Sequence, residues 1–186
     1  MKPIIGRLPI LLLAILALTY LAYPQRQIDK GGLPNFYKLN DKLYRGAQPN
    51  EAGIRELARL GIRTVIDLRA DDALAHKEET QVRAAGMRFI SIPLSNWFSP
   101  RNDQIDQILA ELDFAADQPI FIHCNRGADR TGTVIAVYRM THEHWSDTRA
   151  INEAKSFHMG WWQVWMKGYI HRYYREHVRH IVKKPV

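Results

Sequence analysis

With 186 residues, the chain is long enough for one domain with a sizeable core and too short for two ordinary domains. Hydrophobic residues make up 46% of it and charged residues 24%, which excludes a disordered or fibrous protein. The formal net charge of +7 suits an anionic partner such as phosphate groups, acidic lipid or nucleic acid, but it does not identify a fold.

The first predicted element is an apolar run near the N-terminus. Residues 8–23, LPILLLAILALTYLAY, contain no charged residue. As a helix they would extend about 24 Å, slightly under the roughly 30 Å hydrocarbon core of a bilayer. We expect residues 1–23 to be a membrane anchor, that is, a transmembrane or signal-anchor helix, and residues 24–35 to be a linker. A cleaved signal sequence is the alternative, but the triplet Tyr20-Leu21-Ala22 begins with a bulky residue where the processing site needs a small one.

The basic residues around this run suggest an orientation in the membrane. Lys2 and Arg7, with the terminal amine, favour a cytoplasmic N-terminus, which would place the rest of the chain on the opposite side. Arg26 and Lys30 weaken this expectation, so the membrane side stays open.

From Phe36 onward, the sequence alternates between strand and helix patterns. Strands are predicted at 42–49, 62–69, 87–94 and 119–124, and helices at 50–61, 72–85, 103–116 and from near Arg130 onward. Strands joined through helices by short connections pair in parallel. We therefore expect residues 36–186 to form one α/β domain with a central, mostly parallel sheet of four to five strands flanked by helices.

The last predicted strand leads into HCNRGADRTG, residues 123–132, which contains the only cysteine of the chain. A single cysteine excludes an internal disulfide framework, a paired-cysteine redox site and a cysteine zinc site. A junction of strand and helix directs backbone N–H groups and the positive end of the helix dipole at one point, which forms an anion site. Gly127 supplies backbone freedom to the loop. We expect the same field to lower the pKa of Cys124 and to give a thiolate nucleophile.

The residues after the loop complete a predicted catalytic group. Arg130 can bind two phosphate oxygens with its planar guanidinium and stabilise the charge of the transferred group. Cys124 would attack phosphorus to form a cysteinyl-phosphate, which water then hydrolyses. The hydroxyl of Thr131 is placed to assist the departure of sulfur. The predicted phosphate-binding residues are Cys124, Asn125, Arg126, Gly127, Ala128, Asp129 and Arg130.

These residues resemble the signature of the cysteine-dependent protein tyrosine and dual-specificity phosphatases. The resemblance covers residues 36–160, since LYRGAQP and TVIDLR are also similar to segments of small bacterial members, some of which are exported or anchored in a membrane. It implies a compact phosphatase-like α/β domain with a shallow active site, no metal, no other cofactor and a general acid on a separate loop. In a bacterium, the expected location is the inner membrane with the domain in the periplasm.

The resemblance implies hydrolysis of phosphate monoesters, on proteins that carry phosphotyrosine or phosphoserine/threonine. A phosphoinositide or another phospholipid headgroup is the alternative substrate for the same chemistry, and no nucleic-acid partner is expected. Three other interpretations of the motif are weaker. An inert buried cysteine leaves the rest of the motif unexplained, a thiol reductase such as an arsenate reductase needs further cysteines, and intact Cys124 and Arg130 argue against an inactive phosphate-binding module.

The general acid departs from the family pattern. An aspartate is usual about thirty residues before the cysteine, but the sequence there is SNWFSPRND, and Asn96 or Trp97 occupies the equivalent position. Asp103 is the nearest carboxylate, in the predicted first turn of a helix. Asp129 is the other candidate, because an aspartate at this place in the loop serves as acid in myotubularin-like and Sac-like phosphoinositide phosphatases, although it could instead hydrogen-bond the loop backbone.

Two further expectations concern residues outside the motif. Arg45 and Arg69 are predicted to form structural ion pairs with Asp67, Asp71 or Asp72. In the C-terminal segment, Trp161, Trp162 and Trp165 are expected to pack a final helix against the domain, with a basic end in solvent. The alternative is that this helix lies on anionic headgroups.

Overall fold

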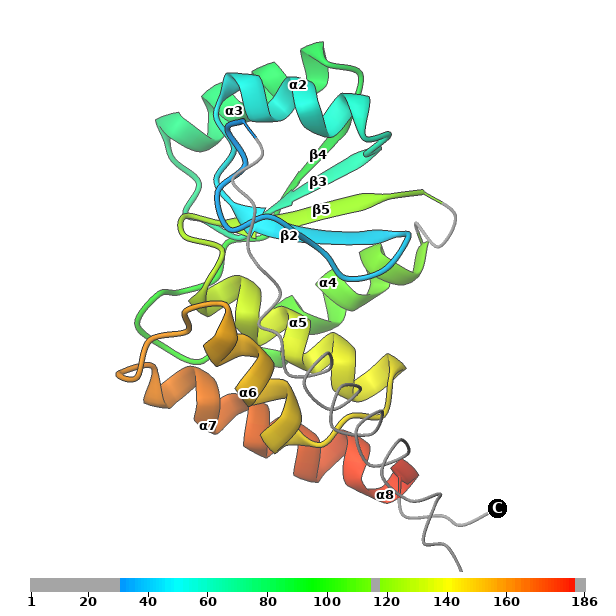
Figure 1. Cartoon of the computed structure of the whole chain (residues 1–186). Helices are drawn as coiled ribbons and strands as arrows, with labels where there is room; N and C mark the ends of the chain where they lie inside the picture. Colours follow the sequence, from blue (N-terminus) through cyan, green and yellow to red (C-terminus); the bar gives the residue numbers. More distant parts are fainter. Residues whose placement is uncertain (1–30, 115–117, 183–186) are drawn as a thin grey trace, which may run out of the picture.

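The computed structural model describes residues 31–114 and 118–182 (Figure 1). The predicted anchor, residues 1–23, and most of the predicted linker, residues 24–35, lie outside this range. Within the described residues, no helix combines the length and the hydropathy that a membrane span requires.

A five-stranded sheet forms the centre of the domain, with the order β1-β2-β5-β3-β4. The strands are β1 (Tyr37–Lys38), β2 (Leu43–Ala47), β3 (Thr64–Asp67), β4 (Arg88–Ser91) and β5 (Ile120–Cys124). Only the β1–β2 pair is antiparallel among the pairs of this sheet, which confirms the prediction of a mostly parallel sheet. The short strand β1 was not predicted.

Helices cover both faces of the sheet (Figure 1). Helices α2 (Glu51–Arg59) and α3 (Ala73–Ala84) lie on one face, while α4 (Asn102–Phe114) and α5 (Asp129–His142) lie on the other. Helices α6 (Asp147–Ser156) and α7 (Val164–Tyr173) pack outside α5, and a π-helical turn, η1 (Tyr174–Val178), leads into α8 (Arg179–Val182). The predicted start of α2 is confirmed, since the Asn50 side chain accepts a hydrogen bond from the Gly53 N–H at 3.0 Å.

Strand β5 is buried along its whole length, and its residues point alternately to the two faces of the sheet. Ile120, Ile122 and Cys124 belong to the core cluster that β5 forms with α4, α5 and α7. Phe121 belongs to the other cluster, beneath α2 and α3, and His123 stacks on it with the ring centroids 5.5 Å apart. Because neighbouring residues of a strand point to opposite faces of the sheet, Cys124 faces the layer of α4 and α5, and His123 faces the layer of α2 and α3.

The expected packing of the C-terminal tryptophans is wrong. Trp161, Trp162 and Trp165 are 84%, 48% and 62% exposed, respectively. Helix α7 begins only at Val164, so the first two lie in the preceding turn. The buried stripe of α7 is formed by other residues at helical spacing, namely Met166, Tyr169, Ile170 and Tyr173.

Candidate active site

Residues 125–128 connect β5 to α5, and the segment 124–130, which adds the last residue of β5 and the first two of α5, is here called the β5–α5 loop. Three successive carbonyl groups of this loop are bound by donors from residues 35–48. These bonds are Gln48 N–H to Asn125 O at 3.2 Å, Asn35 Nδ2 to Arg126 O at 3.0 Å, and Arg45 Nη2 to Gly127 O at 2.6 Å. Because a trans peptide directs its C=O and the following N–H in opposite directions, the next three N–H groups point away from these donors. The loop is therefore held with its amides turned toward its open side.

Gly127 is required by the close contact between this loop and β2. Its φ of +65° lies in the left-handed region. A Cβ atom at this position would lie 2.3 Å from the backbone of Gly46, which leaves no space for a side chain. The loop and β2 therefore meet backbone to backbone.

Helix α5 presents its N-terminus to the same loop. Ala128 is its N-cap and offers no side-chain hydrogen bond to the first N–H groups of the helix. These groups and the positive end of the helix dipole are suited to an anion.

Cys124 lies at the base of the loop and is 2% exposed. Burial raises the pKa of its thiol, but the nearby Thr131 hydroxyl and backbone N–H, followed by the charges of Arg130 and His123, lower the pKa further than burial raises it. The result is a pKa below the ordinary value for cysteine. The loop therefore favours a thiolate at its centre.

Arg130 leads back toward the sheet from the first turn of α5. Its Nη1 lies 3.4 Å from the carbonyl oxygen of Leu68, the residue that follows β3. Its Nε is buried and has no hydrogen-bond partner among the described residues. A guanidinium with an unused donor beside the cysteine is suited to an oxyanion.

Arg45 has a position that the sequence did not predict. Its side chain is fully buried under the loop, where its guanidinium bonds Gly127 and lies 4.0 Å from the centroid of the Phe157 ring. Burial lowers its pKa to about 10, while the negative charges of Glu153 and Cys124 act in the opposite direction. The predicted ion pair with a neighbouring aspartate is therefore wrong for Arg45, which instead holds the loop from below.

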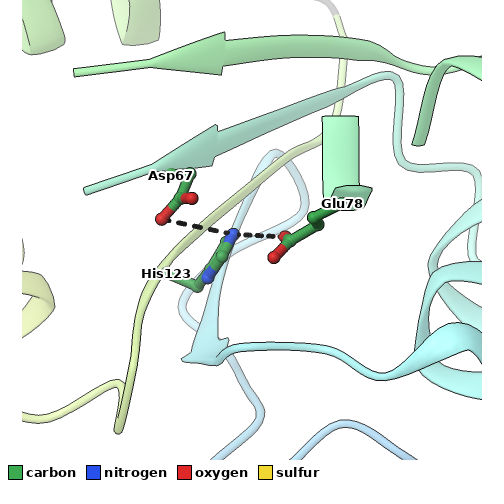
Figure 2. Close-up of side chains that lie close together, drawn as sticks. All are labelled: Asp67, Glu78 and His123. Carbon is green, nitrogen blue, oxygen red and sulfur yellow. Dashed lines mark ion pairs between the residues drawn. The ribbon is translucent and has the colours of Figure 1, made fainter. Parts of the chain in front are cut away.

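A buried ion-pair network lies on the other side of β5, and Figure 2 shows three of its members, Asp67, Glu78 and His123. It consists of Asp67 at the end of β3, Arg69, Glu78 in α3, and His123. Arg69 Nη2 lies 2.8 Å from Asp67 Oδ2 and 2.7 Å from Glu78 Oε2, which confirms the predicted pairing of Arg69 with Asp67. His123 Nε2 lies 2.8 Å from Glu78 Oε1, and Nδ1 lies 3.4 Å from the Cys124 carbonyl oxygen. The network thus connects α3 to the residue that carries the sulfur.

The charges of this network are balanced when His123 is protonated. Burial alone lowers the pKa of His123, but the close contact and ion pair of its Nε2 with the Glu78 carboxylate, together with the charge of Asp67, raise it above 6.5. Two carboxylates then face one guanidinium and one imidazolium. The imidazolium is one of the charges that favour the Cys124 thiolate.

The same residues could in principle coordinate a metal ion, since ligand atoms of Asp67, Glu78 and His123 lie within 4.8 Å of one another. However, the guanidinium of Arg69 already bonds both carboxylates. A cation at this position would face that positive charge at close range. The contacts favour an ion-pair network over a metal site.

Asp103, one of the two predicted acids, lies in the first turn of α4 and is 68% exposed at its side chain. Two hydrogen bonds from the Arg101 guanidinium, at 2.9 and 2.8 Å, hold its carboxylate. This contact lowers the pKa of Asp103, which is the opposite of what a proton donor at neutral pH requires.

Asp129, the other predicted acid, is buried within the loop. Its Oδ1 accepts a hydrogen bond from the Gly160 N–H at 2.8 Å, and its Oδ2 is paired with Arg126. These contacts connect the loop to the segment after α6, and they agree with the structural alternative for this residue. A role as general acid stays a prediction.

A family model described as "DSP-PTPase phosphatase fused to NAD+ Kinase" matches residues 34–163, which include the β5–α5 loop and most of the contacts just described. The chain belongs to this phosphatase family.

Two relatives illustrate the range of this phosphatase family. The dual specificity protein phosphatase TpbA of Pseudomonas aeruginosa is 30% identical over 125 residues, which are 64% of this chain and 52% of TpbA. The inositol diphosphatase SIW14 of Saccharomyces cerevisiae is 27% identical over 137 residues, or 70% of this chain and 48% of SIW14. The chain thus spans about half the length of these curated relatives.

Solved structures of both relatives share the fold. A crystal structure of TpbA has a TM-score of 0.67 at 23% identity and covers 84% of this chain and 99% of that one. In another, TpbA is in complex with pTyr, and the TM-score is 0.59 at 25% identity with 70% and 83% covered. The catalytic core of SIW14, described as a PP-IP phosphatase in complex with citrate, has a TM-score of 0.69 at 22% identity, with 81% and 91% covered.

Proposed function

We propose that the chain is a hydrolase of phosphate monoesters that acts through a cysteinyl-phosphate intermediate. The observation that carries this proposal is the thiol of Cys124, whose pKa is lowered at the centre of a loop with outward-held carbonyls. The unused Nε of Arg130 and the uncapped start of α5 supply further donors for an oxyanion. Membership of the phosphatase family supports the same conclusion.

In the proposed reaction, the Cys124 thiolate attacks phosphorus while the bond to the leaving oxygen breaks. Arg130 and the loop amides stabilise the charge on the equatorial oxygens. Water then attacks the phosphorus of the intermediate, and sulfur leaves as the thiolate. The Thr131 hydroxyl, which already favours the thiolate, would assist that departure.

The proposed substrates are proteins that carry phosphotyrosine or phosphoserine/threonine. The name of TpbA and its structure with pTyr support this choice. Within this group, the contacts of the two candidate acids favour phosphotyrosine. Asp103 and Asp129 are both already paired, and a phenolate of ordinary pKa about 10 needs less help from a proton donor than an alkoxide does.

A phosphorylated inositol headgroup is the second candidate. The pairing of both aspartates supports it when the leaving group is itself a phosphate, because such a group departs without a proton donor more readily than an alkoxide. SIW14 is named an inositol diphosphatase, which supports the same direction. A phosphoinositide or another phospholipid headgroup, predicted from the sequence, is a further alternative for the same chemistry, but its leaving group is an alkoxide, so the pairing of the two aspartates does not support it.

For the location of the enzyme, the proposal keeps the expectations from the sequence. Residues 1–23 would anchor the chain in a membrane, residues 24–35 would link it, and residues 36–186 would form the phosphatase domain. In a bacterial inner membrane, the domain would face the periplasm.

The proposal is tested by a substrate panel measured with a metal chelator present. It contains p-nitrophenyl phosphate, phosphotyrosine, phosphoserine and phosphothreonine peptides, a phosphoinositide in vesicles and an inositol pyrophosphate. We expect turnover of p-nitrophenyl phosphate with the chelator, trapping of a phosphorylated Cys124 by acid quench, and a preference for phosphotyrosine over phosphoserine. Turnover that persists in Cys124→Ser would contradict the covalent mechanism, and a preference for the inositol substrates would select the second candidate.

A further inference from the structure

Six large apolar side chains on two neighbouring segments are exposed at one end of the domain. This aromatic patch consists of Trp97 (72% exposed), Phe98 (71%), Trp161 (84%), Trp162 (48%), Val164 (60%) and Trp165 (62%). Single exposed apolar residues are ordinary on a protein surface, but a contiguous group of this kind marks an interaction site.

The two segments are joined by direct contacts. Ser99 Oγ donates to the Trp165 carbonyl oxygen at 3.1 Å, and Gln163 Nε2 lies 3.4 Å from the Asn96 carbonyl oxygen. The rings of Trp161 and Trp162 meet edge to face, with centroids 5.9 Å apart. The patch is therefore one surface, formed by the segment after β4, the turn before α7 and the first residues of α7.

This surface adjoins the β5–α5 loop. The guanidinium of Arg126 lies 5.8 Å from the ring centroid of Trp162. The Gly160 N–H, just before the patch, bonds Asp129 inside the loop. Whatever covers the aromatic patch will therefore lie next to the mouth of the active site.

Positive charge accompanies the aromatic residues. The side chain of Arg126 is 53% exposed, and Lys167 Nζ donates to the Trp161 carbonyl oxygen at 2.8 Å. Partial burial and then the positive charge of Lys155 lower the pKa of Lys167, while the negative charge of Asp129 acts in the opposite direction. Arg126 and Lys167 thus place positive charge beside the aromatic residues, which favours an anionic partner.

We propose that the aromatic patch docks on the surface of an anionic lipid bilayer and holds the mouth of the β5–α5 loop at the level of the headgroups. Tryptophan is suited to this depth, because its ring is apolar and its indole N–H can meet the polar interface. The adjacent lysines match the charge of acidic lipids. The uncharged apolar run at residues 8–23, which is predicted to be a membrane anchor, supports a location of the same chain at a membrane.

This docking differs from anchoring by the N-terminal run. An anchor at residues 1–23 does not by itself fix the direction in which the active site faces. Docking through the patch would fix the active site toward the lipid. It does not depend on the proposed hydrolysis, and its test uses no substrate.

The tryptophans themselves report on docking, because four of the five in the chain belong to the patch and residues 8–23 contain none. The fifth, Trp145, lies elsewhere, against Arg149, with the guanidinium 3.6 Å from the ring centroid. The experiment measures tryptophan emission of the full-length Trp145→Phe chain in vesicles of brominated phosphatidylcholine with phosphatidylglycerol. Unbrominated vesicles of the same composition serve as the reference.

We expect strong quenching by the brominated lipid and a blue shift of the emission, both weaker in vesicles without phosphatidylglycerol and at high salt. Replacement of Lys155 and Lys167 by Glu in the same background keeps every tryptophan of the patch. We expect this variant to shift the docking equilibrium toward the free domain by at least about fivefold per lysine, so that quenching decreases.

Several outcomes would overturn the proposal. Emission that is equal in brominated and unbrominated vesicles would mean that the chain is anchored without docking. Quenching that is indifferent to lipid charge and to the lysine variant would show that charge has no part in docking. Protection of the patch through self-association, seen as crosslinked dimers with no quenching, would identify a second copy of the chain as the occupant.

Discussion

The residues behind the β5–α5 loop and the residues around its mouth are built in opposite ways. Behind the loop, Arg69 pairs with both Asp67 and Glu78, and His123 pairs with Glu78, all of them buried. Around the mouth, the aromatic patch is exposed and the nearby carboxylates are already paired. The buried residues behind the loop hold the nucleophile in place. The exposed residues around its mouth determine which substrates reach the nucleophile.

We infer that residues behind the loop determine the rate of catalysis and that residues around its mouth determine the preference among substrates. Changes behind the loop should alter the rate for every substrate equally, because they act on the thiolate that all substrates share. Changes at the mouth should alter the ranking of substrates, since they act on the leaving group or on its surroundings.

The largest expected effect comes from Cys124→Ser, which removes the nucleophile. We expect turnover to fall on the order of 10⁴-fold or more for all substrates, because serine lacks an adjacent base here and its hydroxyl does not ionise at neutral pH. Calorimetric binding of a phosphotyrosine peptide should survive in the variant. If the serine variant is active, a residue other than Cys124 is the nucleophile.

The second effect comes from Arg130→Lys, which keeps the charge and loses the planar fork. We expect kcat to fall on the order of 10²–10³-fold in a p-nitrophenyl phosphate assay, because one ammonium cannot bind two equatorial oxygens. Arg126→Lys is the matched control within the same loop. Since the Arg126 side chain is 53% exposed, its effect should be less than about fivefold. An equal decrease of kcat in both variants would contradict the proposed binding of two phosphate oxygens by Arg130.

The third effect comes from Glu78→Gln, which leaves Arg69 and His123 with less negative charge. We expect a loss of about 3–5 kcal/mol in the free energy of unfolding by urea, because a buried ion pair loses one partner. Glu79→Gln is the adjacent control. Its side chain is 35% exposed and paired with Arg83, so the loss should be about 0.3–0.5 kcal/mol.

The pH dependence of Glu78→Gln separates a positioning role from a purely structural one. The folded pKa of His123 is raised above 6.5, so its stabilising charge is fully present below pH 6.5 and lost as pH rises through the folded pKa. The difference in unfolding free energy between wild type and variant should therefore be largest below pH 6.5. The acid limb of kcat/KM should also move to higher pH, because Cys124 loses the help of the imidazolium. If the acid limb of kcat/KM does not move, Glu78 contributes to stability alone.

The smallest and most discriminating effect comes from Asp129→Asn, compared with Asp103→Asn. Because both oxygens of Asp129 are bonded to Gly160 and Arg126, we expect a decrease of about tenfold or less that is the same for every leaving group. Asp103→Asn should leave the rates unchanged. A series of aryl phosphates tests this, since a loss that grows with the pKa of the leaving phenol would identify the mutated residue as the general acid.

The sequence predicted the strand, loop and helix of the site because their signals are local. Helix α5 begins at Asp129, one residue from the predicted start, and Asn50 caps α2 as expected. The role of Arg45 could not be predicted, because it depends on the parallel pairing of β2 with β5, which lie far apart in the chain.

Glu78 was missed although the sequence contained a sign of it. It shares one face of α3 with Ala75 and Val82, the spacing of a buried stripe, and a carboxylate in such a stripe requires a buried partner. The predicted packing of the tryptophans against the domain was wrong for another reason. Their aromatic character suggested burial, while the inward face of α7 was already supplied by other residues.

The burial of Arg45 has a consequence for covalent labelling of the enzyme. The negative charge of the Cys124 thiolate raises the pKa of this buried guanidinium and so stabilises its protonated form under the loop. Iodoacetamide would cap the sulfur with a neutral amide and remove that counter-charge, whereas iodoacetate would return a carboxylate to the same place. The two adducts are almost equal in size, so the amide adduct should melt at a lower temperature than the acid adduct for electrostatic reasons alone.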